Sequence, residues 1–103
     1  MKAHISLPKE KIAGYCHRWG VARLALFGSV IRDDFRPDSD VDVLVTFQPD
    51  TRHTLFDMAR MQTELQQILG RDVDLVSRRG IENSRNHLRR KAILESAEVI
   101  YGQ

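Results

Sequence analysis

The sequence contains one cysteine, few aromatic residues, no long apolar run and almost no net charge. The single cysteine, Cys16, excludes an internal disulfide framework and a cysteine-rich zinc site. Apolar runs extend over a few residues at most, which is too short for a transmembrane helix. The first eight residues also lack the apolar core of a signal peptide. We therefore expect a cytoplasmic protein that has no membrane partner.

The small net charge argues against a nucleic-acid-binding protein. The 103 residues carry a formal charge of only +2, so long-range attraction to nucleic acid is not a property of the whole molecule. The sequence also has no helix-turn-helix signal and no aromatic platform on which bases could stack. Direct nucleic-acid binding is therefore not expected.

Much of the positive charge lies in one segment. Between Arg78 and Lys91 there are six Arg or Lys residues and one acidic residue, Glu82. Two interpretations of this segment stay open. It is either a solvated helix face or a surface that contacts a triphosphate or an acidic partner.

The composition is typical of a small globular domain. With 42% hydrophobic and 29% charged residues, the chain is expected to form a single domain over residues 1–103. Alternating, Val-rich segments predict strands, and apolar residues at helical spacing predict helices. Strands are expected at 21–27, 40–47 and 72–77, and a short edge strand or helix end at 99–101. Helices are expected from about Pro8 to Trp19, at 55–69 and at about 82–95. This order predicts an α/β (α+β) fold with a small mixed sheet and helices mainly on one face.

A few side chains outside these patterns need an assignment. Trp19, Phe47 and Phe56 are expected in the core rather than against a cofactor. The four histidines show no metal-ligand spacing and are expected at the surface.

Paired aspartates stand at the start of two predicted strands. Asp40 and Asp42 are two residues apart, as are Asp72 and Asp74, so the members of each pair point to the same face of their strand. If the strands are neighbours, three or four carboxylates converge, and two of them ~4 Å apart would repel by roughly 4 kcal/mol at an effective dielectric constant of 20. A bound proton or a cation would relieve this repulsion. Oxygen ligands favour Mg²⁺ or Mn²⁺ over zinc.

Gly28 and Ser29 directly follow the first predicted strand. Glycine lets the backbone approach a phosphate and adopt a positive φ, and exposed amides at such a turn form an anion-binding nest. The Ser29 hydroxyl adds a donor. Ten residues separate this turn from Asp40. The turn and the carboxylates together predict a triphosphate held by backbone and metal.

The segment 27–45 resembles the minimal nucleotidyltransferases, the MNT branch of the polymerase-beta superfamily, and the segment 73–76 resembles the strand that carries that family's third carboxylate. The resemblance implies a polymerase-beta-like nucleotidyltransferase fold. By the same resemblance, Asp40 and Asp42 would hold two Mg²⁺ ions, with Mn²⁺ as the alternative metal, and Asp74 would help to hold one and activate a hydroxyl. Gly28 and Ser29 would bind the phosphates of ATP. Arg32 matches a basic residue that is frequent in the family.

The resemblance also implies a reaction and a partner. Family members transfer a nucleoside monophosphate, most often AMP from ATP, to a hydroxyl. Short stand-alone members are typically antitoxins paired with a HEPN-type ribonuclease toxin, and some attach AMP to a tyrosine of that toxin. We therefore expect a protein adenylyltransferase that neutralises a HEPN partner. The alternative is an antitoxin that neutralises its partner by contact alone.

Overall fold

The computed structural model describes residues 7–31 and 40–102. The elements in chain order are α1 (Lys9–Trp19), β1 (Val21–Phe27), the 3-10 helix η1 (Gly28–Ile31), β2 (Val41–Phe47), α2 (Leu55–Leu69), β3 (Val73–Ser77), α3 (Arg78–Glu82), α4 (His87–Ser96) and β4 (Glu98–Tyr101). None of the helices in the described ranges is long and apolar enough to cross a membrane.

The four strands form one mixed sheet in the order β3-β2-β1-β4. β1 is antiparallel to β2 and to β4, whereas β3 is parallel to β2. Parallel neighbours need a crossover connection, and α2 supplies it. The predicted mixed sheet is therefore confirmed, and the segment at 99–101 is an edge strand.

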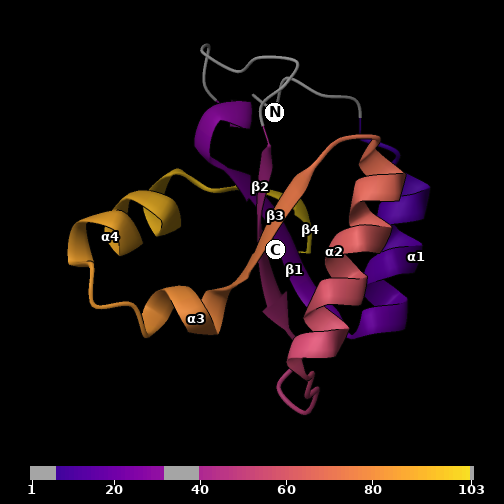
Figure 1. Cartoon of the computed structure of the whole chain (residues 1–103), viewed down its shortest axis with the longest axis horizontal. Helices are drawn as coiled ribbons and strands as arrows, with labels where there is room; N and C mark the ends of the chain where they lie inside the picture. Colours follow the sequence, from indigo (N-terminus) through magenta and orange to yellow (C-terminus); the bar gives the residue numbers. More distant parts are fainter. Residues whose placement is uncertain (1–6, 32–39, 103) are drawn as a thin grey trace.

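The two long helices, α1 and α2, cover one face of the sheet (Figure 1). The alternation of β2 places Val41, Val43 and Val45 on this face, where all three are buried. Tyr15 of α1 donates its hydroxyl to the backbone carbonyl of Met61 in α2 at 3.1 Å. This buried hydrogen bond joins the two helices above the sheet.

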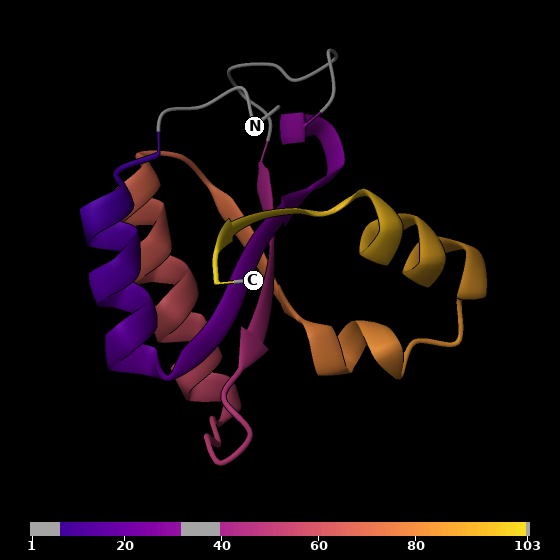
Figure 2. The same ribbon diagram turned by 180° about the vertical axis from the view of Figure 1, so that it is seen from behind.

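The opposite face carries a second, smaller cluster. Phe27 and Leu44 of the sheet pack there with Ile81 of α3 and Ile93 of α4. Seen from behind, α3 and α4 lie on the far side of the sheet from α1 and α2 (Figure 2). The expectation of helices mainly on one face thus holds for α1 and α2, while α3 and α4 contact the other face.

The helix expected at about 82–95 begins later than predicted, at His87, and the short helix α3 that precedes it was not predicted. Ser77 caps α3 by accepting a hydrogen bond from the Gly80 N–H at 3.0 Å. Asn86 caps α4 by accepting one from the Arg89 N–H, also at 3.0 Å. Ser and Asn stabilise helix starts in this way, and each cap begins a new helix.

The start of α2 shows a second difference from expectation. Thr54 and Asp57 form a capping box there, with the Thr54 N–H 2.9 Å from an Asp57 carboxylate oxygen. Met61 and Leu65 of this helix are buried in the core, whereas Phe56 in its first turn is 82% exposed instead of buried. His53, expected at the surface, is half-buried with its Nε2 2.6 Å from the Trp19 carbonyl oxygen.

Candidate active site

The register of the sheet places Asp42 beside Asp74. The two residues are partners across the parallel pair of β2 and β3, and both alternate with buried valines or leucines that face α1 and α2. Their side chains therefore project from the opposite face, the one that α3 and α4 contact. Asp42 is half-buried and Asp74 is exposed. The sheet register confirms that the two strands are neighbours and that Asp42 and Asp74 share a face.

Asp40 lies at the same end of the sheet but is not drawn into one cluster with the other two. It is exposed and directly precedes β2, as Asp72 precedes β3. Across the part of the chain that the structure describes, no group of three or more His, Cys, Asp or Glu side chains is close enough to hold a metal ion. The expected convergence of three or four carboxylates is therefore not found among the described residues, although Asp42 and Asp74 are register partners.

The position of Gly28 explains where the Asp42 carboxylate lies. Gly28 has a φ of +74°, and a Cβ built on it would overlap an Asp42 carboxylate oxygen and lie 3.2 Å from the Asp42 Cγ. The carboxylate of Asp42 therefore rests on the β1 side of β2, while Asp74 stands on the β3 side. The space left by the missing side chain of Gly28 accommodates this carboxylate.

The predicted phosphate turn meets the carboxylates because β1 is antiparallel to β2. Phe27, the last residue of β1, is the register partner of Asp42, so η1 begins next to the start of β2. The backbone of Ser29 lies in η1. Arg32, the third residue expected to bind phosphate, falls outside the described residues. Figure 1 shows η1 at the end of the sheet where β2 and β3 begin.

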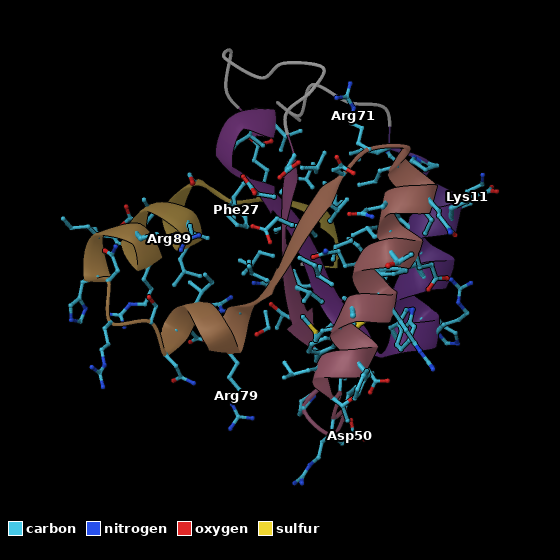
Figure 3. The ribbon with its side chains drawn as sticks, viewed as in Figure 1. Lys11, Phe27, Asp50, Arg71, Arg79 and Arg89 are labelled. Carbon is cyan, nitrogen blue, oxygen red and sulfur yellow. The ribbon has the colours of Figure 1, made fainter. Side chains whose placement is uncertain are left out.

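Hydrophobic residues attach the basic segment to the same face. Phe27 packs with Ile81 and Ile93, and it lies between the sheet and α4 in Figure 3. Arg89 is one helical turn before Ile93, so it lies on the side of α4 that carries the contact with the sheet. Arg90 is engaged elsewhere, because its guanidinium donates to the Glu82 carbonyl oxygen at 3.1 Å.

The single thiol is not part of this site. Cys16 is buried in α1, on the other face of the sheet, and burial raises the pKa of its thiol to about 12. A buried, protonated thiol does not act as a nucleophile.

Two residues that sequence reasoning did not single out contact the strand that carries Asp74. Gln62 and Gln66 of α2 accept hydrogen bonds from backbone amides of β3. Their spacing of four residues places them on one face of a helix, and this spacing can be recognised in the sequence. Only the fold shows what that face contacts.

The arrangement suits a hard divalent cation. Asp42 and Asp74 supply charged oxygen donors, which Mg²⁺ and Mn²⁺ prefer. The absence of a side chain at Gly28 leaves room for the Asp42 carboxylate.

Residues 9–100 match the model of the nucleotidyltransferase domain family. The chain belongs to this family. The match extends from α1 to β4, so it includes the turn at Gly28 and both strands that carry the aspartates.

Two archaeal relatives are named as protein adenylyltransferases. A Methanocaldococcus jannaschii protein described as a candidate protein adenylyltransferase is 36% identical over 69 residues, which cover 67% of this chain and 72% of that protein. The Thermococcus cleftensis protein adenylyltransferase MntA is 35% identical over 66 residues, which cover 64% of this chain and 65% of that protein.

Solved structures share the fold. A candidate minimal nucleotidyltransferase has a TM-score of 0.65 and 39% identity over 86% of this chain and 85% of its own. A toxin–antitoxin complex with AMP-PNP has a TM-score of 0.71 and 20% identity over 94% of this chain and 75% of its own. A tri-AMPylated Shewanella oneidensis HEPN toxin in complex with an MNT antitoxin gives a TM-score of 0.62 at 20% identity, over 92% of this chain and 70% of the matched chain. The last two similarities support the fold alone.

Proposed function

We propose that this protein transfers AMP from ATP to a hydroxyl, a tyrosine hydroxyl of a HEPN-type toxin, and thereby neutralises that toxin. The observation that carries the proposal is the register pairing of Asp42 with Asp74 beside the Gly28 turn, in a chain of the nucleotidyltransferase family. Support comes from relatives named protein adenylyltransferase and from structural similarity to an MNT antitoxin bound to an AMPylated HEPN toxin. We take residues 1–103 to act as one such domain in the cytoplasm.

The proposed roles follow from where the residues lie. Asp40, Asp42 and Asp74 would hold two Mg²⁺ ions, or Mn²⁺ in their place. When bound, these ions would neutralise charge on the triphosphate and lower the pKa of the acceptor hydroxyl. The backbone N–H groups at Gly28 and Ser29 would hold the phosphates, and Arg32 would add a positive charge. Because Asp74 is exposed, an acceptor on another protein can approach it.

The transfer itself is an in-line displacement at the α-phosphorus of ATP. The acceptor oxygen forms a bond to phosphorus as the bond from phosphorus to the bridging oxygen of pyrophosphate breaks. The hydroxyl proton passes to Asp74 or to solvent, and pyrophosphate leaves. Holding the triphosphate and the acceptor in line supplies a large part of the rate acceleration.

The test uses two aspartates that differ in position. Asp42→Asn removes a charge at the proposed site, whereas Asp50→Asn removes the same charge in the exposed turn after β2, at the other end of the sheet (Figure 3). Each variant is incubated with ATP, Mg²⁺ and the HEPN partner from the adjacent reading frame, and AMP on the partner is measured by mass spectrometry. We expect transfer by wild type and Asp50→Asn and none by Asp42→Asn.

Two results would overturn the proposal. One is transfer by Asp42→Asn at the wild-type rate. The other is full silencing of the partner by Asp42→Asn without any AMP on it, which would show an antitoxin that acts by contact alone.

A further inference from the structure

The outer edge of β3 is bonded to side chains of a helix instead of to another strand. The backbone N–H of Val73 donates to Gln66 Oε1, and that of Leu75 donates to Gln62 Oε1, each at 3.1 Å. In a parallel strand, alternate residues direct their amides to the same side. The backbone amides of Val73 and Leu75 therefore point toward α2, while the backbone groups of Asp72 and Asp74 point toward β2. On that side the Asp72 carbonyl accepts a hydrogen bond from the Val41 N–H.

The spacing of the helix matches the spacing of the strand. Four residues along a helix advance about 6 Å, and two residues along a parallel strand advance about 6.6 Å. Gln66 meets the first of the two amides and Gln62 the second, because α2 runs antiparallel to β3. Both glutamines are half-buried, so water competes poorly for the amides they accept from. The two glutamines thus accept two of the hydrogen bonds that a neighbouring strand would otherwise accept.

The register that this pair supports decides where Asp74 stands. A slip of β3 by one residue would turn Asp74 to the face that α1 and α2 cover. A slip by two residues would move it about 6.6 Å along β2 and away from Asp42. We propose that Gln62 and Gln66 are positioning residues for Asp74, which hold β3 in the register that metal-dependent AMP transfer requires. The metal part of this inference rests on the proposed function, whereas the strand part does not.

The test removes the acceptors without changing side-chain length. Gln62→Met, Gln66→Met and the double variant lack the amide oxygen, and Gln62→Glu keeps an acceptor. Gln67→Met is the matched control, because Gln67 is an exposed residue of the same helix that lines the outer groove between α1 and α2. We expect hydrogen exchange of the Val73 and Leu75 amides to be about fivefold faster in the corresponding Met variants, the effect of one neutral hydrogen bond.

A second readout separates positioning from general stability. In the double Met variant we expect the Mn²⁺ dissociation constant of the folded protein, and the Mg²⁺ concentration for half-maximal AMP transfer, to rise about fivefold or more. The rate at saturating Mg²⁺ should change less than twofold. Gln62→Glu should restore slow exchange of Leu75, and Gln67→Met should match wild type in every measurement. A loss of overall stability alone would not change the metal affinity of the folded molecules.

The outcomes are distinguishable. Unchanged exchange of both amides, or faster exchange with an unchanged Mn²⁺ dissociation constant, would overturn the positioning role. Absence of AMP transfer by the wild type would instead count against the proposed function, and the exchange rates would still decide whether the glutamines hold the strand.

Discussion

Gly28→Ala is expected to lower AMP transfer at least a hundredfold while costing about 1 kcal/mol more folding free energy than a matched glycine substitution elsewhere. A Cβ at Gly28 would overlap the Asp42 carboxylate, and the backbone φ there is +74°. Gly70, at the end of α2, has a φ of +68°, and a Cβ built there meets nothing within 4 Å. The two substitutions therefore share a backbone cost and differ in what the new methyl group meets.

The magnitudes follow from these two terms. An alanine in the left-handed region costs about 1 kcal/mol relative to glycine, and both variants should lose this much of the free energy of unfolding. At Gly28, Asp42 can relieve the overlap by leaving its preferred rotamer, which costs about 1 kcal/mol more. The carboxylate then no longer stands where the proposed reaction needs it. A displacement of about 1 Å lowers rates by about a hundredfold, and we expect at least that loss for Gly28→Ala only.

A double-mutant cycle makes the contact itself measurable. Urea unfolding gives the stability of Gly28→Ala in the wild type and in an Asp42→Ala background. Without the carboxylate, the added methyl group has nothing to overlap, so the substitution should cost about 1 kcal/mol instead of about 2 kcal/mol. Two results would refute this reasoning: an equal cost in both backgrounds, or AMP transfer by Gly28→Ala at the level of Gly70→Ala.

Asp57→Asn should flatten the acid side of the stability–pH curve, measured by urea unfolding. The hydrogen bond from the Thr54 backbone N–H lowers the pKa of Asp57, so its stabilisation is present above the ordinary carboxyl pKa and is lost as pH falls through the lowered one. Gly14→Ala in α1 should raise the free energy of unfolding by about 0.5–1 kcal/mol in thermal melts, because its Cβ meets nothing within 4 Å. Arg89→Glu should weaken binding of the HEPN partner more than Arg60→Glu does in calorimetry, whereas equal effects would favour a solvated helix face.

Local signals in the sequence were sufficient to predict most of the fold. The three predicted strands and the helix at 55–69 end within a residue or two of their observed bounds, because alternation, capping residues and Gly70 are all local. The two basic helices were not separated, since the choice between one helix and two depends on the caps at Ser77 and Asn86. Phe56 was misplaced because the apolar stripe of α2 is broader than the part that the sheet covers.

The candidate site was predictable in its residue types but not in its contacts. Alternation along β2 and β3 shows that Asp42 and Asp74 can share a face, yet only the register makes them partners. The approach of the Asp42 carboxylate to Gly28 joins residues 14 positions apart, and no local pattern encodes it. The hydrogen bond from the Leu75 N–H to Gln62 also joins residues far apart in the sequence, 13 positions from each other. The roles assigned to the site residues remain predictions: Gly28, Ser29, Arg32, Asp40, Asp42 and Asp74.

The pairing of Asp42 with Asp74 also gives a test of metal binding that needs no partner protein. Neighbouring strands lie about 4.8 Å apart, and the Asp42 carboxylate lies toward Gly28, so the two carboxylates repel by at most about 1 kcal/mol in water. Because Asp74 is exposed, the value for water applies, and Asp74→Asn should raise the free energy of unfolding by up to that amount in buffer without divalent cations. Mg²⁺ at ~100 times its dissociation constant should then stabilise the wild type by about 2.7 kcal/mol and Asp74→Asn by clearly less. If Mg²⁺ stabilises both equally, this carboxylate pair does not bind the ion, and neutralisation of the partner by contact alone becomes the better explanation.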